Sequence, residues 1–140
     1  MYRILKLVVL TIILNACVSD NDLITVNPSL VFHNNTSKVW LVNHKNKGGK
    51  DFSPLSMKYK EIIIFHKTGN FYMQKMNTLG DEIGQNGSFE VSNNLKKVKF
   101  DFQNQVWTFD LLLLTNERII LKPKSNYNYT LELIPIPEPR

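Results

Sequence analysis

The spacing of short apolar runs constrains the fold of this chain more than any other feature. From Ser37 onward, about eight such runs follow one another at intervals of about eight to twelve residues, with turn-forming residues between them. No intervening segment predicts a helix of useful length, and parallel strands would need crossover helices. The pattern therefore predicts an antiparallel sheet whose consecutive strands are joined by short turns.

The clearest strand is expected at residues 95–102, where Val98, Phe100 and Phe102 alternate with charged residues. The other expected strands are residues 39–42, 61–67, 71–76, 87–91, 106–114, 118–122 and 127–134, with residues 23–26 as a short candidate edge strand. The leucine run 111–114 would suit a helix, but its strand-like neighbours favour a strand. Residues 45–50, with two glycines among lysines, are expected to form a polar loop.

We predict an all-β fold in which an antiparallel up-and-down meander closes into a small barrel. A β-sandwich is the alternative. Closure would remove the exposed sheet edges that otherwise make apolar strands such as residues 62–65 prone to aggregate. The prolines in the tail from Pro135 onward cannot donate ladder hydrogen bonds, so the last strand is expected to end there.

The N-terminus has the pattern of an export signal. Basic residues precede the apolar run of residues 7–14, which is shorter than the ~20 apolar residues needed to span a bilayer. Ala16 then precedes Cys17, the only cysteine. The segment resembles a bacterial lipoprotein signal with a lipobox. This implies cleavage after residue 16 and acylation of Cys17 with fatty-acyl chains such as palmitate. The alternative is an ordinary signal peptide cut near Cys17.

This reading divides the chain into a signal peptide of residues 1–16, a lipidated cysteine and tether of residues 17–36, and one barrel domain of residues 37–137. Cleavage would leave 124 of the 140 residues, which is enough for one domain. It would also lower the formal net charge from +5 to +3. Such a weakly basic chain lacks the dense Lys/Arg stripe of a nucleic-acid binder, and a single cysteine forms no intramolecular disulfide.

Several segments of residues 37–136 resemble small lipocalin-like lipoproteins of the Bacteroidetes kind. The matching segments are a Trp-bearing first strand at residues 39–41, an aromatic-basic-Gly-Asn-aromatic hairpin at residues 65–71, a Gly-x-Phe strand at residues 87–89, and apolar strands at residues 111–114 and 119–121. The resemblance implies a lipocalin-like barrel in the cell envelope, with the outer membrane as the favoured site and a periplasmic or surface-facing domain. Residues 18–22 are either a surface-export signal or a polar tether.

Large aromatic rings are the best candidates for the barrel interior. In most small barrels such rings fill the core, but if a cavity exists they would line it, with two tyrosines at its mouth. The predicted pocket residues are Trp40, Phe65, Tyr72, Phe100, Phe102, Trp107, Phe109 and Tyr129.

No residue pattern in the sequence predicts catalysis. His33, His44 and His66 have neither metal-ligand spacing nor a neighbouring carboxylate, and Asp81 and Glu82 lack the alternating oxygen ligands of a calcium loop. Nucleophile elbows, phosphate loops and zinc motifs are also absent from the sequence. We therefore predict no enzyme, no metal site and no cofactor.

Two functions from different classes follow from these patterns. The first is non-enzymatic binding of a small apolar ligand inside the barrel, which predicts a cavity. The second is a protein-interaction lipoprotein, either an immunity protein that neutralises a toxin or a subunit of an envelope or secretion assembly. This second function predicts a filled barrel that binds an envelope protein through loops such as residues 45–51 and 79–87.

Overall fold

The computed structural model describes residues 29–92, 94, 96–125 and 128–137. The described strands are β1 (Ser37–Lys47), β2 (Lys50–Asp51), β3 (Glu61–His66), β4 (Asn70–Lys75), β5 (Gln85–Val91), β6 (Lys97–Phe102), β7 (Gln105–Leu114), β8 (Ile119–Pro123) and β9 (Thr130–Pro135). Cys17 and the candidate strand at residues 23–26 lie outside the described residues, so the lipidation site and the tether stay predictions.

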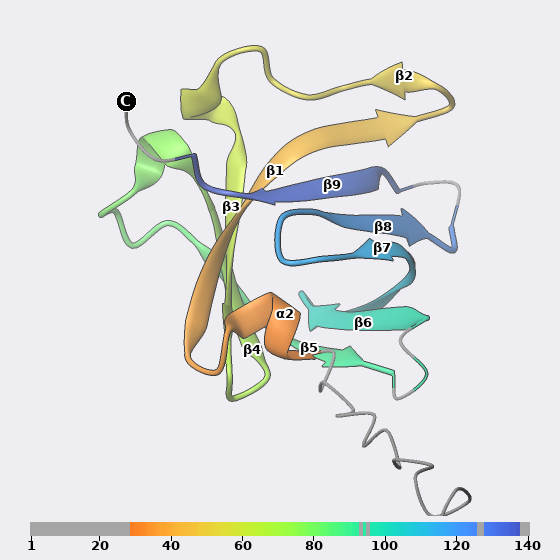
Figure 1. Cartoon of the computed structure of the whole chain (residues 1–140). Coiled ribbons are helices and arrows are strands. Elements are labelled where there is room, and N and C mark those ends of the chain that lie inside the picture. Colours follow the sequence, from red (N-terminus) through yellow and green to blue (C-terminus); the bar gives the residue numbers. More distant parts are fainter. Residues whose placement is uncertain (1–28, 93, 95, 126–127, 138–140) are drawn as a thin grey trace, which may run out of the picture.

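Eight of these strands form a closed antiparallel barrel. The sheet order is β2-β1-β3-β4-β5-β6-β7-β8-β9, and β1 also pairs with β9 from Trp40–Pro135 to Asn46–Thr130 (Figure 1). The additional strand, β2, continues the sheet from the far end of β1. The predicted all-β, up-and-down antiparallel barrel is confirmed, because consecutive strands are neighbours and the first barrel strand closes on the last.

Turns that require left-handed backbone connect the strands where the sequence predicts them. Gln103 and Asn104 have φ of 53° and 60°, as in the two-residue turns that match the twist of a hairpin. The expected polar loop at residues 45–50 is instead a hairpin between β1 and β2. Gly48 and Gly49, with φ of 58° and 78°, form its turn, and the preceding residues stay in β1 because they pair with β9.

The leucine run is a strand, as predicted. Leu111 pairs with Leu121, Leu113 pairs with Ile120, and the register shifts between them. This bulge leaves the Leu112 side chain 58% exposed on the outside of the barrel. An uninterrupted apolar run can therefore occupy a strand that has only one buried face.

A short helix, α2 (Ser29–His33), plugs one end of the barrel where the sequence analysis expected only tether. It contacts β1 and β3 (Figure 1). Phe32 is fully buried, and its ring meets that of Phe65 edge-on at 5.0 Å. The indole Nε1 of Trp40 donates a hydrogen bond of 2.9 Å to the Phe32 carbonyl oxygen. Asn34 and Asn35, both with positive φ, end the helix.

The other described helical segments are the 3₁₀ turns η1 (Met57–Tyr59) and η2 (Met76–Thr78). Across the part of the chain that the structure describes, no helix has both the length and the apolar character needed to span a bilayer.

A connected group of aromatic rings forms a large part of the barrel core. Phe65 packs against the rings of Phe32, Phe89 and Phe100 at centroid distances of 4.9–6.0 Å. Phe100 then contacts Phe71 and Phe109, each at 5.5 Å and nearly perpendicular. Edge-to-face contacts of this kind stabilise a core beyond the area that they bury.

Removing the plug should destabilise the whole barrel. We expect Phe32→Ala to lower the free energy of unfolding by about 3–5 kcal/mol, because it opens a void in a fully buried site. Phe52→Ala is the matched control, since Phe52 is 47% exposed, and it should cost less than about 1 kcal/mol. Urea denaturation followed by far-UV circular dichroism measures both. Equal losses in the two variants would contradict a plug role for Phe32.

Candidate functional site

The barrel is not completely filled. A cavity of about 290 Å³, called here the barrel cavity, lies inside it. Its apolar lining residues are Ile63, Phe71, Met73, Phe100, Phe102, Trp107, Phe109 and Leu131. Its polar lining residues are Lys45, Glu61, Asn128 and Tyr129. Ligand pockets in proteins combine a mostly apolar wall with a few polar groups in this way, and the volume is at the small end of their usual range.

The polar lining residues mark the mouth of the barrel cavity. Lys45 lies near the end of β1, Glu61 begins β3, and Tyr129 directly precedes β9. Because adjacent strands are antiparallel, these positions share one end of the barrel. The plug α2 packs at the opposite end, against the start of β1 and the end of β3. The barrel is therefore closed by Phe32 at one end and polar at the other.

The structure brings most of the predicted pocket residues together. Phe100, Phe102, Trp107, Phe109 and Tyr129 line the barrel cavity. Trp40 and Phe65 are fully buried beside the plug and do not line the cavity.

Tyr72 lies on the outer face of the barrel. It alternates along β4 with Phe71 and Met73, which both line the cavity. Its ring lies against Gly84, where an added Cβ would come within 1.9 Å of a Tyr72 ring carbon. Tyr72 is therefore not at the mouth where the sequence analysis placed it.

Phe71 also lines the barrel cavity, although it was not among the predicted pocket residues. Phe71 pairs with Gly87 across β4 and β5, and a Cβ at Gly87 would lie 2.6 Å from the Phe71 ring. A glycine inside a strand often marks such a close approach. From the sequence, either of the adjacent aromatic residues Phe71 and Tyr72 could face the barrel interior. The glycine at position 87 leaves room for the Phe71 ring on the inner face, which favours Phe71 as the inward-facing residue.

An ion pair spans the mouth. Lys45 Nζ and Glu61 Oε2 are 2.8 Å apart, with side-chain exposures of 27% and 26%. Beside them the rings of Tyr129 and Phe52 pack at 5.5 Å. The ammonium groups of Lys45 and Lys47 lie 5.8 and 5.7 Å from the Tyr129 ring centroid. The mouth therefore combines aromatic surface with two ammonium groups and one carboxylate.

A second hollow of about 380 Å³, called here the side cavity, adjoins the mouth. Lys45 and Glu61 line this side cavity as well as the barrel cavity. Phe52, Tyr59 and Lys75 are also among the lining residues of the side cavity. The Lys45–Glu61 pair thus forms part of the wall of both cavities.

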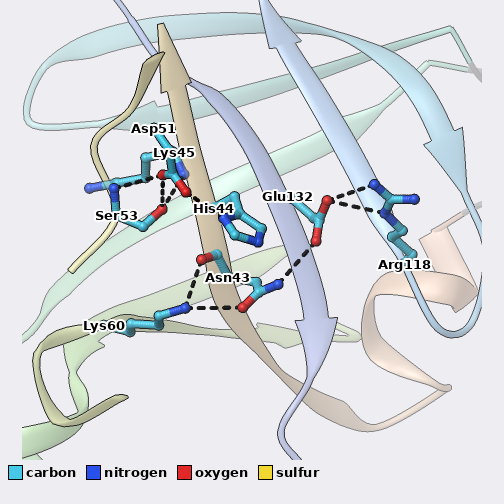
Figure 2. Close-up of polar contacts among 8 residues, drawn as sticks. All are labelled: Asn43, His44, Lys45, Asp51, Ser53, Lys60, Arg118 and Glu132. Carbon is cyan, nitrogen blue, oxygen red and sulfur yellow. Dashed lines mark hydrogen bonds and ion pairs between the residues drawn. The ribbon is translucent and has the colours of Figure 1, made fainter. Parts of the chain in front are cut away.

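A row of polar contacts crosses the outside of the closing strands (Figure 2). Lys60 Nζ donates to the backbone and side-chain oxygens of Asn43 at 2.8 and 3.0 Å. Asn43 Nδ2 donates to Glu132 Oε1 at 3.0 Å, and Arg118 Nη2 donates to Glu132 Oε2 at 2.7 Å. Asn43 is the residue at which β1 shifts register against β9. These contacts therefore stabilise the bulge at the barrel closure.

This environment changes the acidity of Glu132. Burial acts to raise the pKa of its carboxyl, but the bonds from Asn43 and Arg118 outweigh burial and hold the pKa below its ordinary value. Glu132 is therefore ionised at neutral pH.

His44, Asp51 and Ser53 lie together but are not arranged as a catalytic triad. Asp51 accepts hydrogen bonds from the Ser53 hydroxyl and amide and lies 2.7 Å from His44 Nδ1 (Figure 2). These contacts lower the pKa of the Asp51 carboxyl. The hydroxyl of a triad serine must contact the imidazole that takes its proton, whereas Ser53 contacts the carboxylate. The cluster ties β2 to β1, where the Lys45 amide donates to Ser53 Oγ at 2.8 Å.

The other two histidines have structural contacts. His33 is buried in α2, where its Nδ1 accepts a hydrogen bond of 2.9 Å from the Asn35 amide, and burial lowers its pKa. His66 Nδ1 lies 2.6 Å from the Ser37 hydroxyl. Asp81 and Glu82 are exposed. Among the described residues, no three His, Cys, Asp or Glu side chains are grouped so as to hold a metal ion.

Comparison with known proteins does not assign the chain to a family. No protein-family model matches it, and a search of curated proteins found no match.

The Glu132 contacts predict a pH-dependent contribution to stability. We expect Glu132→Gln to lower the free energy of unfolding by about 1 kcal/mol at pH 7, since it removes the charge that Arg118 contacts. The folded-state pKa is depressed, so this stabilisation is present above the unfolded value of about 4.3 and is lost as the pH falls through the folded value.

Urea denaturation of both proteins between pH 7 and pH 3 measures the difference. Lys122→Met, which removes a charge from β8 outside this row, is the control. A difference between wild type and Glu132→Gln that stays constant down to pH 3 would contradict the assignment.

Proposed function

We propose that the protein is a lipid-anchored lipoprotein of the cell envelope whose barrel binds a small apolar ligand without catalysing a reaction. The observation that carries this proposal is the barrel cavity of about 290 Å³, closed at one end by Phe32 and lined mainly by apolar side chains. Burial of apolar ligand surface against such a wall drives binding, and the shape of the wall selects the ligand. The lipocalin-like resemblance of the sequence supports the same function.

The cavity favours ligand binding over the protein-interaction alternative. That alternative predicts a barrel filled by side chains, whereas ring packing is continuous beside the plug and incomplete towards the mouth. The interior of an eight-stranded barrel is wide enough either to be filled by side chains or to hold one small ligand. The size and packing of the inward-facing side chains therefore determine whether a cavity remains.

The anchor is proposed from the sequence. The lipobox at residues 14–17 would place acyl chains on Cys17, and each buried CH₂ adds about 0.8 kcal/mol of membrane affinity. Two or more chains hold a protein on a bilayer without a spanning helix. The barrel would then face the periplasm or the cell surface.

Exposed apolar side chains favour an interaction surface as a second candidate function. Leu55, Leu79 and Ile83 are 104%, 51% and 71% exposed, in the loops that contain or border η1 and η2. These two turns contact one another, so the exposed residues gather at one end of the molecule. Contiguous exposed apolar surface often marks a protein contact, and residues 79–87 are one of the loops predicted to make it.

The ligand-binding proposal predicts uptake of a neutral apolar probe. We expect N-phenyl-1-naphthylamine to become fluorescent in the wild-type protein. Met73→Trp should weaken its binding about tenfold or more, because the larger ring occupies the barrel cavity. Leu112→Trp is the matched control on the outer face, where Leu112 is 58% exposed, and it should bind as wild type does. No probe binding, or equal weakening in both variants, would overturn the proposal.

The anchor proposal predicts the mass of the mature protein. Protein purified from membranes of its native host should begin at Cys17 and carry the added mass of acyl chains. A Cys17→Ala variant should lose this mass and leave the membrane fraction. Intact-mass spectrometry measures both. A soluble wild-type chain without acyl mass would contradict the anchor and leave the barrel's binding function to be judged by the probe.

A further inference from the structure

We propose that the barrel-cavity ligand is a single-chain amphiphile with an anionic head, and that Lys45 binds this head by releasing Glu61 to Lys75. This inference rests on the proposed function, since it names the chemical class of the ligand and the residue that selects it. The Lys45–Glu61–Lys75 group at the mouth is called here the exchange group.

Lys45 is placed to meet the polar end of a ligand whose apolar part fills the barrel. It lines the cavity together with Leu131 and Tyr129, and its Nζ lies 5.8 Å from the Tyr129 ring centroid. The deeper wall carries apolar side chains such as Phe71 and Phe109, which offer no partner for a charge, whereas Trp107, a lining residue whose Nε1 has no hydrogen-bond partner, lies near the mouth-end start of β7. The head of an amphiphile therefore stays at the mouth, next to Lys45.

The charges at the mouth favour an anion over a cation. Two ammonium groups, those of Lys45 and Lys47, lie within 6 Å of the Tyr129 ring centroid. Glu61, which also lines the cavity, forms an ion pair with Lys45, with 2.8 Å between Glu61 Oε2 and Lys45 Nζ. An anionic head group can take the place of the Glu61 carboxylate as the partner of Lys45. A cationic head group would instead be repelled by the ammonium groups of Lys45 and Lys47.

Glu61 has a second cation within reach once the ligand takes Lys45. Glu61 and Lys75 are direct partners in the register between β3 and β4, and both line the side cavity. Directly opposite residues on antiparallel strands have Cβ atoms about 4.5–5.5 Å apart, close enough for a cross-strand ion pair. Glu61 can therefore turn from Lys45 to Lys75 and keep a partner while the ligand is bound.

The exchange is easy because the existing ion pair is only partly buried. Side-chain exposures of 27% and 26% leave both charges in contact with water, and pairs of this kind contribute little to stability. Moreover, β1 pairs with β3 only from Ser37 to Leu41, so no backbone hydrogen bonds of that ladder tie Lys45 to Glu61. Side-chain rotation is enough to open the contact.

Competition between ligands of equal chain length tests the head-group preference. The full protein is loaded with N-phenyl-1-naphthylamine, which carries no charge, and titrated at pH 8 with decanoate, decanol or decylamine. We expect decanoate to displace the probe at about tenfold lower concentration than decanol, and decylamine to be the weakest.

Variants of the exchange group test the residues. Lys45→Met should weaken decanoate about tenfold more than it weakens decanol or the neutral probe. Lys75→Met should weaken decanoate about threefold, because Glu61 then has no second partner. This loss should vanish when Glu61→Gln is combined with Lys75→Met, as the double-mutant cycle requires. Lys122→Met removes the same charge outside the barrel cavity and should leave decanoate binding unchanged.

The outcomes separate this inference from the proposed function. Neutral probe binding with a decanoate preference that Lys45→Met abolishes supports both. Neutral probe binding with equal affinity for the three head groups overturns the anionic ligand and leaves the cavity function standing. An equal loss in Lys45→Met and Lys122→Met also overturns it, because net charge alone would then explain the preference. No binding of the neutral probe overturns the proposed function itself.

Discussion

The pairing of β1 with β9 is the constraint on which the rest of the structure depends. It runs from Trp40–Pro135 to Asn46–Thr130 and converts a meander with two open edges into a barrel with an interior. One edge of β1 pairs with β9, while its other edge pairs with β3 up to Leu41 and with β2 from Asn46 onward. The β1–β9 register shifts at Asn43, between the parts of β1 that pair with β3 and with β2, and the bonds from Asn43 to Lys60 and Glu132 stabilise this bulge.

The end of the β1–β3 ladder at Leu41 makes the two ends of the barrel different. Where β1 still pairs with β3, α2 inserts Phe32, whose ring packs against those of Phe65 and Phe89. Beyond Leu41 that ladder ends, and side-chain contacts take its place: Lys60 with Asn43 and Lys45 with Glu61. The barrel cavity lies towards this second end, so its wall includes a polar contact that side chains alone maintain.

Much of the fold could be predicted from local sequence, because alternation and turn chemistry act over a few residues. The strand β6 (Lys97–Phe102) and the turn at Gln103–Asn104 are examples. The plug could not be predicted, since Phe32 is one apolar residue in a short segment and its burial depends on Phe65 and Trp40. Which side of β4 faces the barrel interior depends on its pairing with β5. For this reason the prediction from sequence placed Tyr72 at the mouth and did not include Phe71. The Lys45–Glu61 pair joins strands that do not pair at those residues, which no local pattern records.

The most direct measurement of the central claim, that the apolar cavity inside the closed barrel binds ligand, is methyl NMR of the methionines during addition of N-phenyl-1-naphthylamine. Met73 lines the barrel cavity, while Met57 is 44% exposed among the apolar loop residues. Binding inside the barrel predicts a large shift of the Met73 methyl signal and little change at Met57. A shift at Met57 with an unchanged Met73 signal would contradict the claim, because the probe would then bind the outer loops and not the barrel.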